Sequence, residues 1–279
     1  MLKGQKLVLI GASGAIGGHF LEQAIAHGAQ CLNIGRRTPQ QRNVPHIEAD
    51  ITSLSSLQKA AQQAQEHLGR IDTVLNFAGT HHKPMDFTRD DPEFLETEFD
   101  RVVRVNLHGA FMVTMVFAKR LIAQRHGHLI HLGSNASRLS LYGSYAYTAS
   151  KHGLEGLIKT AAAQLAPYGV RVNGVAPGTV ETPLNSHLLR QGPDHTPSPR
   201  AASILAHTPT KRFASLEGIS ETLLAACIPQ RHLTGNLLFC DDGYNIEGHS
   251  WPEGNLAVYQ GDVDALYRTL EQELSDDPT

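Results

Sequence analysis

The sequence has few cysteines and no long hydrophobic segment. Its 279 residues include only Cys31, Cys227 and Cys240, an odd set that argues against a disulfide framework and favours a reducing compartment. No apolar run approaches the roughly 18 residues of a membrane span. The first apolar run is broken by Gly11, too early for a secretory signal. We therefore expect a cytoplasmic protein that has no membrane partner.

A basic block and a metal-binding pattern are also missing. Lysine and arginine are scattered and the net charge is −3, so nothing indicates a nucleic-acid partner. The 16 histidines do not fall into metal-ligand spacing such as His-Glu-x-x-His. We therefore expect no metal site. With 41% hydrophobic residues, the chain is suited to one large α/β domain or two small ones.

Short apolar segments alternate with helical patterns along the chain. The apolar segments do not alternate strictly with polar residues, which is typical of a parallel sheet covered by helices on both faces. We predict a single doubly wound, Rossmann-type α/β domain over residues 1–245, with a seven-stranded parallel sheet. Its strands are expected at residues 6–10, 31–35, within 44–50, within 70–79, at 127–134, within 169–178 and within 233–243.

Three segments between or after the strands are distinctive. Residues 93–124 form a long helical pattern that is interrupted near 106–109. Residues 181–211 are rich in Pro, His and Ser and follow the sixth strand, where α/β sheets bind ligands, so we expect a lid with two short helices. Residues 246–279 are expected to be a C-terminal extension of the same domain, with a last helix near 263–274.

A glycine-rich turn follows the first expected strand and precedes a helical pattern. Gly11, Gly14 and Gly17 let the backbone turn tightly and leave room for a pyrophosphate. The phosphates would meet the N–H groups and the positive dipole end of the helix. The turn therefore predicts a dinucleotide site.

Arg36 and Arg37 follow the second expected strand, at the end that faces the adenosine ribose in a dinucleotide fold. A carboxylate there would hold the 2′-hydroxyl of NAD, whereas two guanidinium groups pair well with a 2′-phosphate. The pattern favours NADP(H) over NAD(H). The other interpretation is an exposed basic turn.

Tyr147 and Lys151 are four positions apart in a segment with helical composition, so the two side chains share one face. A neighbouring ammonium is expected to lower the pKa of the Tyr147 phenol and make it usable for proton transfer. Ser134 ends the fifth apolar run, where its hydroxyl can orient a carbonyl. Tyr-x-x-x-Lys alone also arises by chance on surface helices, so the neighbouring motifs decide its meaning.

Together these residues resemble the short-chain dehydrogenase/reductase family over about the first 245 positions. The motifs follow the order and spacing of that family: the glycine turn at 11–17, Asn-Phe-Ala-Gly at 76–79, Asn106, Ser134, Tyr147 with Lys151, and Pro177-Gly178. Four positions depart from its pattern: Ile10, Ala15, Phe77 and Asp242.

The resemblance implies roles for these residues. Tyr147 would be the general acid/base, Ser134 would polarise the substrate carbonyl or hydroxyl, and Lys151 would also bind the nicotinamide ribose. Asn106, the fourth catalytic residue, would hold a water linking Lys151 to solvent. The implied cofactor-binding residues are Gly11, Ser13, Gly14, Ile16, Gly17, Arg36, Arg37, Asp50, Ile51, Asn76, Ala78, Gly79, Tyr147, Lys151, Pro177, Gly178, Val180 and Thr182.

The sequence thus predicts an NADP(H)-dependent oxidoreductase that transfers hydride to or from a small polar alcohol or ketone, with polyols, sugars and sugar acids as candidates. The alternatives are a non-catalytic NADP(H)-binding sensor and a sugar-modifying epimerase or dehydratase with a retained cofactor. The resemblance also implies a homo-oligomer, a dimer or tetramer formed through two long helices. Candidate substrate contacts are His81, His82, Ser137, Arg138, His187 and Arg190.

Overall fold

The computed structural model describes residues 1–246, apart from 42, 141–142, 183–184, 193 and 230–231. The predicted helix near 263–274 lies outside the described residues, as does the C-terminal extension beyond residue 246. By its internal contacts the chain divides into two compact units: Met1–Pro177 with Ser215–Cys240, and Gly178–Ala214 with Asp241–Thr279. Each unit is described by itself.

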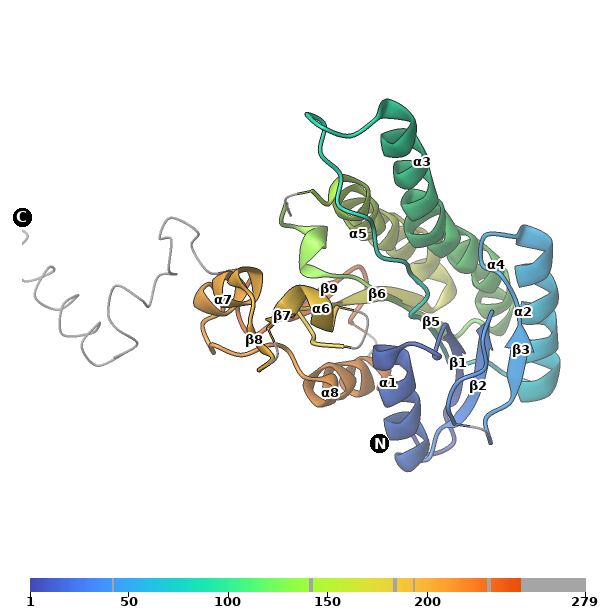
Figure 1. Cartoon of the computed structure of the whole chain (residues 1–279). Coiled ribbons are helices and arrows are strands. Elements are labelled where there is room, and N and C mark those ends of the chain that lie inside the picture. Colours follow the sequence, from blue (N-terminus) through green and yellow to red (C-terminus); the bar gives the residue numbers. More distant parts are fainter. Residues whose placement is uncertain (42, 141–142, 183–184, 193, 230–231, 247–279) are drawn as a thin grey trace, which may run out of the picture. The chain divides into compact units, whose positions relative to one another are not determined.

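The first unit is built on a seven-stranded parallel sheet, which confirms the predicted fold class. Its strands run in the order β3-β2-β1-β4-β5-β6-β9 (Figure 1). Their bounds are β1 Lys6–Ile10, β2 Gln30–Gly35, β3 His46–Glu48, β4 Thr73–Asn76, β5 Gly127–Leu132, β6 Val170–Pro177 and β9 Leu237–Cys240. The third strand is shorter than predicted and ends before Asp50.

The strand order reverses beside β1, because β2 and β3 lie on one side of it and β4 lies on the other. The register pairs Ile10, the last residue of β1, with Ile34 on one side and with Asn76 on the other. Open α/β sheets bind ligands outside the carboxyl ends of the strands at such a reversal. The glycine turn and the Asn76–Gly79 segment both start there.

Helices cover both faces of the sheet (Figure 1). On one face α1 packs against α8, and on the other α2 packs against α4, which packs against α5. Every residue of β4 is buried, as expected for a strand covered on both faces. The helix bounds are α1 Ala15–Ala26, α2 Leu54–Leu68, α3 Pro92–Val103, α4 Gly109–Gln124, α5 Tyr145–Leu165 and α8 Leu216–Cys227.

The interruption predicted near 106–109 is a change of helix type rather than a break. The π-helical turn η1 (Arg104–His108) joins α3 to α4. Gly109 is the first residue of α4. It packs tightly against the core, where a Cβ at this position would lie only 2.6 Å from Cδ1 of Ile51. By length and composition alone, the whole helix Pro92–Gln124 could cross a membrane, but 56% of its most apolar window is buried inside the protein, as in a core helix.

The second unit contains α6 (Ser186–Leu189), an antiparallel pair of two-residue strands, β7 (Arg190–Gln191) and β8 (Thr196–Pro197), and α7 (Pro199–Ala206). The two predicted short helices are therefore confirmed in part, because Arg190 and Gln191 pair with β8 instead of continuing a helix. Asp242 has φ 55°, a left-handed value at the position where the resembled family has glycine, and its Oδ1 accepts a hydrogen bond from Arg212. A lid role for this unit stays a prediction.

Candidate active site

The glycine turn is held between β2 and the end of β4. The amide of Gly11 donates to the carbonyl of Ile34, and the amide of Ala12 donates over 3.0 Å to Oδ1 of the buried Asn33. Gly11 has φ 82°, and a Cβ at this position would lie 2.9 Å from the amide nitrogen of Ala78. Only glycine allows the turn to approach β4 this closely.

Phe77 explains one departure from the family pattern. Its ring lies 5.7 Å from that of Phe20 on α1, and a Cβ on Gly17 would approach Phe77 Cγ to 3.1 Å. The aromatic side chain therefore fills the space under the first turn of α1. Gly14 is the N-cap of α1 and has no side chain to cap it. The first turn of α1 is thus suited to the pyrophosphate of a dinucleotide, whose oxygens would accept from its N–H groups.

Arg36 and Arg37 come directly after β2 and are exposed, and Asp50 comes shortly after the neighbouring strand β3. The carboxylate of Asp50 accepts two hydrogen bonds of 2.8 Å from Thr52, one from its amide and one from its hydroxyl. These bonds lower the pKa of Asp50 against the effect of partial burial, and the charges of Arg36 and Arg104 lower it further. Ile51 is buried in the hydrophobic core, so a contact with adenine stays a prediction.

The predicted Ser134, Tyr147 and Lys151 do come together. Ser134 follows β5 and lies close enough to Tyr147, on the first turn of α5, to affect the pKa of its phenol. One turn later, Nζ of Lys151 lies 5.6 Å from the centre of the Tyr147 ring and donates over 2.7 Å to the carbonyl of Leu132. Two hydroxyl groups and an ammonium group therefore meet at the carboxyl end of β5.

The expected lowering of the Tyr147 pKa is wrong for this structure. Burial raises the pKa of Tyr147, and the hydrogen bond with Ser134 opposes that effect only in part. Burial also lowers the pKa of Lys151 from 10.5 to about 8. The ammonium lies over the ring, and with this pKa an increasing fraction of Lys151 is neutral as the pH rises above neutral. Desolvation therefore dominates the pKa of both groups.

Asn106 lies in the π-helical turn and binds the loop that follows β4. Its Oδ1 accepts from the amide of Thr80 over 2.7 Å, and its Nδ2 donates to the carbonyl of Thr80 over 3.0 Å. Nδ2 also lies 3.4 Å from Oγ of Ser150, which donates to the carbonyl of Tyr147. Asn106 thus connects this loop to α5, and its role in holding a water stays a prediction.

A buried polar chain under the site was not predicted. Oδ1 of Asn76 accepts from the amide of Ala78, and Nδ2 of Asn76 lies 3.3 Å from Nδ1 of His131. Nε2 of His131 lies 3.0 Å from the hydroxyl of Thr114 on α4. Burial lowers the pKa of His131 to about 4, and the charge of Lys151 adds to this. The available signal was a polar residue inside an otherwise apolar strand, as for Asn33.

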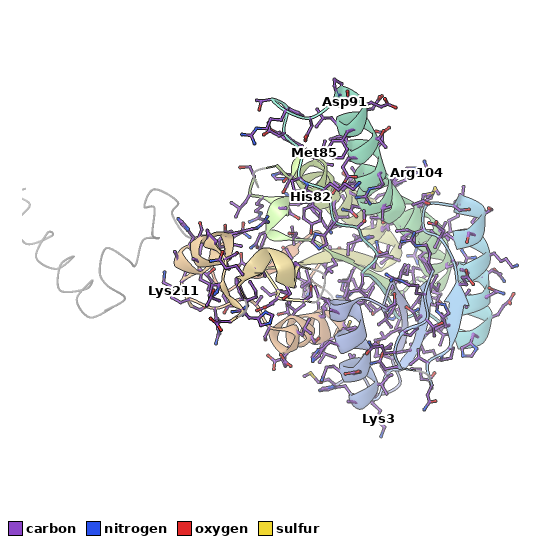
Figure 2. The ribbon with its side chains drawn as sticks, in the orientation of Figure 1. Lys3, His82, Met85, Asp91, Arg104 and Lys211 are labelled. Atoms are coloured by element: carbon purple, nitrogen blue, oxygen red, sulfur yellow. The ribbon has the colours of Figure 1, made fainter. Side chains whose placement is uncertain are left out.

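The candidate substrate contacts separate into groups. His82 lies on the loop between β4 and α3 (Figure 2), directly after His81. The ring centres of His81 and His82 lie 5.8 Å and 5.5 Å from that of Tyr147. Arg190 forms an ion pair with Glu181 in the second unit. The side chain of His187 lies outside the described part of the structure.

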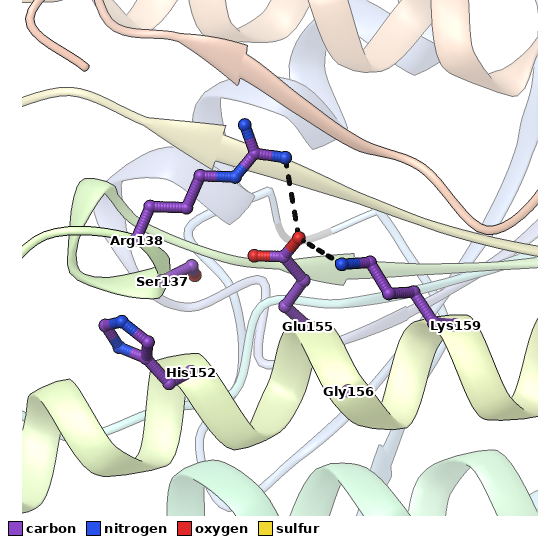
Figure 3. A pocket seen from close by; sticks show the side chains of 6 residues that line it. All are labelled: Ser137, Arg138, His152, Glu155, Gly156 and Lys159. Atoms are coloured by element: carbon purple, nitrogen blue, oxygen red, sulfur yellow. Dashed lines mark hydrogen bonds and ion pairs between the residues drawn. The ribbon is translucent and has the colours of Figure 1, made fainter. Parts of the chain in front are cut away.

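Ser137 and Arg138 face a separate open hollow beside α5 (Figure 3). Glu155, which is buried, pairs there with Lys159 over 2.8 Å and with Arg138 over 3.4 Å. These ion pairs hold the pKa of Glu155 below its usual value against the opposing effect of burial. A contact of Ser137 or Arg138 with the substrate stays a prediction.

The last predicted cofactor contacts fall in both units. Pro177 ends β6 in the first unit, whereas Gly178, Val180 and Thr182 belong to the second. There, Asn185 donates to the carbonyl of Val180 and accepts from the amide and hydroxyl of Thr182. Contacts of these residues with a nicotinamide stay a prediction. Among the described residues, no three His, Cys, Asp or Glu side chains are grouped so that they could hold a metal ion.

Comparison with known proteins agrees with this geometry. The family model of the short chain dehydrogenases matches residues 5–192. The chain is 31% identical over 200 residues to the 3-oxoacyl-[acyl-carrier-protein] reductase of Thermotoga maritima, covering 71% of this chain and 75% of the relative.

Two solved structures have the same fold. A putative gluconate dehydrogenase from Agrobacterium tumefaciens has a TM-score of 0.75 and 25% identity, covering 88% of this chain and 97% of its own. The aldohexose dehydrogenase of Thermoplasma acidophilum has a TM-score of 0.79 and 23% identity, covering 90% and 97%. The chain therefore belongs to the short-chain dehydrogenase/reductase family and is an NAD(P)-dependent oxidoreductase.

Proposed function

We propose that the protein is an NADP(H)-dependent oxidoreductase of small polar alcohols and ketones, with Tyr147 as general acid/base. The observation that carries the proposal is the position of Lys151 Nζ, 5.6 Å from the centre of the Tyr147 ring, with Ser134 close enough to affect the pKa of that phenol. When bound, the nicotinamide supplies or accepts the hydride, and the protein supplies orientation and proton transfer.

Each of the three side chains has a distinct task. The Ser134 hydroxyl orients the substrate oxygen by a hydrogen bond, and the Tyr147 hydroxyl gives its proton to that oxygen during reduction or takes it during oxidation. Because burial raises the pKa of Tyr147, the phenol is protonated at neutral pH, which is the form needed to reduce a ketone. Lys151 favours the phenolate that this step leaves behind.

Arg36 and Arg37 support a preference for NADP(H), because both are exposed directly after β2. Arg36 is also close enough to Asp50 to lower the pKa of that carboxyl group. Two guanidinium groups suit a 2′-phosphate. A polyol, sugar or sugar acid as substrate is supported by the similarity to the putative gluconate dehydrogenase and by the histidines next to Tyr147.

We also propose a homo-oligomer, a dimer or tetramer that associates through α4 and α5. Phe111 is 48% exposed on α4, a helix whose other apolar side chains are mostly buried. Light scattering should give more than one subunit, and Phe111→Asp should lower the mass. The buried thiols of Cys31 and Cys227 are compatible with the cytoplasmic location that we propose.

Tyr147→Phe tests the proposed chemistry directly. The variant keeps the ring but lacks the proton, so turnover of reduced nicotinamide should fall by about 100- to 10,000-fold, while NADPH binding, followed by fluorescence, is retained. Tyr145→Phe is the matched control, because Tyr145 is exposed and stacks on Phe87 instead. Full turnover by Tyr147→Phe would overturn the assignment. Tight NADPH binding without turnover of any substrate by the wild type would favour a sensor.

A further inference from the structure

We propose that His81 contacts the substrate and selects molecules that carry a hydrogen-bond-accepting oxygen next to the reacting carbon. The inference rests on the proposed function and names a substrate class for it. Its starting point is that the ring of His81 is nearly parallel to that of Tyr147, with an angle of 6° between their planes and 5.8 Å between their centres.

The imidazole of His81 is exposed, whereas the ring of Tyr147 is partly buried. His81 is therefore open to solvent beside the ring that carries the proposed proton donor. A substrate whose oxygen meets the Tyr147 hydroxyl therefore brings its neighbouring atoms within reach of His81. Imidazole can donate a hydrogen bond from either ring nitrogen, depending on the tautomer.

The backbone that carries His81 is fixed on both sides. The residue before it, Thr80, has its amide and its carbonyl bound by Asn106. The carbonyl of His81 itself accepts from Nη2 of Arg101 over 2.7 Å. Two residues further along, the amide of Lys83 donates to the buried carboxylate of Glu98 over 2.5 Å.

Glu98 and Arg101 also bind each other, so the two clamping side chains form one unit on α3. Nε and Nη2 of Arg101 donate to the two carboxylate oxygens of Glu98 over 2.9 Å and 2.8 Å. Such a bidentate ion pair has a fixed direction. The loop therefore holds His81 in a defined place before a substrate arrives, which reduces the entropy lost on binding.

His82 has a different task from its neighbour. Its Nε2 shares a hydrogen bond of 2.7 Å with the hydroxyl of Ser144, the buried N-cap residue of α5. Close by, the amide of Met85 donates to the carbonyl of Gly143 over 2.9 Å. His82 thus anchors the loop to the start of the helix that carries Tyr147.

The ligand chemistry follows from the side chains around the Tyr147 ring. His81, His82 and Lys151 all bear nitrogen donors there. A site that donates hydrogen bonds discriminates strongly against analogues that lack the accepting oxygen, because its polar groups are then desolvated without a partner. The expected substrates therefore share an oxygen that accepts a hydrogen bond, and this oxygen can belong to a hydroxyl or to a carboxylate group.

The test compares butan-2-one, 3-hydroxybutan-2-one and 2-oxobutanoate with NADPH. These ketones differ in whether the neighbouring carbon bears no oxygen, a hydroxyl, or carboxylate oxygens. In the wild type, kcat/KM should be higher for one of the two oxygen-bearing substrates by about tenfold or more. His81→Phe, which keeps a flat ring without donors, should remove this preference mainly through KM.

His81→Gln keeps a hydrogen-bond donor and should keep most of the preference. It is the variant to test if His81→Phe does not bind NADPH. His152→Phe is the matched control, because His152 is an exposed histidine that faces the separate hollow beside α5 (Figure 3). An unchanged preference in His81→Phe would overturn the inference while leaving the proposed function intact. If the wild type reduces no ketone, sugar or sugar acid despite binding NADPH, the proposed function fails and this inference fails with it.

Discussion

Nζ of Lys151 lies 5.6 Å from the centre of the Tyr147 ring, and its hydrogen bond is directed to the carbonyl of Leu132 rather than to the phenol. The ammonium therefore acts on the phenol through space, in an environment where burial lowers its own pKa to about 8. Burying this charge costs folding free energy, which the hydrogen bond to Leu132 offsets in part.

Stability should rise with pH because of Lys151. Below pH 8 the folded and unfolded states both carry the proton, so the full cost of the buried charge is present. Between about 8 and the unfolded value of 10.5, the folded state releases the proton first, and the free energy of unfolding should increase by up to about 3 kcal/mol. Urea denaturation at several pH values between 7 and about 10 measures this rise.

Lys151→Met is the control for this pH dependence, because it keeps the chain length without a titrating group. Other alkaline titrations, such as that of Cys31, whose pKa burial raises, are common to both proteins and cancel in the comparison. The rise should be absent from the curve of the variant, so the difference between the two curves should show it. Parallel curves for the two proteins would mean that Lys151 does not titrate near pH 8.

The fold was predictable from the sequence because its signals are local. Strand β1 matches its predicted bounds, since the apolar run ends at the glycine turn. The end of β3 differs from the prediction because strand length depends on a neighbour: in the described part of the chain β3 is an edge strand, and its pairing with β2 stops at Glu48.

The site was predictable only in part, because much of it is made by long-range contacts. Ser134, Tyr147 and Lys151 follow from motif spacing, but the clamp of Glu98 on the loop depends on the packing of α3. The π-helical turn was visible only as an interruption. The direction of the Tyr147 pKa was missed because spacing indicates the partner but not the extent of burial.

Arg36→Asp should reverse the cofactor preference. The new carboxylate would repel a 2′-phosphate and can accept a hydrogen bond from the 2′-hydroxyl of NAD. We expect KM for NADPH to rise about tenfold or more, because a charge-assisted hydrogen bond is lost, and KM for NADH to fall. Lys59→Asp, an exposed charge reversal on α2, should change neither value. A wild type that already prefers NADH would contradict our interpretation of Arg36 and Arg37.

Glu98→Ala should loosen the loop that carries His81. The change leaves the Arg101 guanidinium and the amide of Lys83 without their buried acceptor, at a cost of about 2–4 kcal/mol in the free energy of unfolding. Substrate KM should rise while the affinity for NADPH stays unchanged, since the glycine turn is not involved. Glu96→Gln, on the exposed side of α3, is the control. Equal losses of substrate and NADPH affinity would point to general unfolding instead.

His131→Asn tests the buried polar chain beneath the site. Burial depresses the pKa of His131 from 6.5 to about 4, so the unfolded state binds a proton first as the pH falls. The stability contributed by the neutral ring is complete above 6.5 and declines by up to about 3 kcal/mol as the pH falls to 4. Asparagine does not titrate but can still pair with Asn76 or Thr114, so the variant should lose less stability between pH 7 and 4.5 than the wild type. His128, which is also buried and has a lowered pKa, titrates in both proteins and cancels in the difference. A wild type and variant that lose stability equally over this range would show that His131 is not held neutral by the fold.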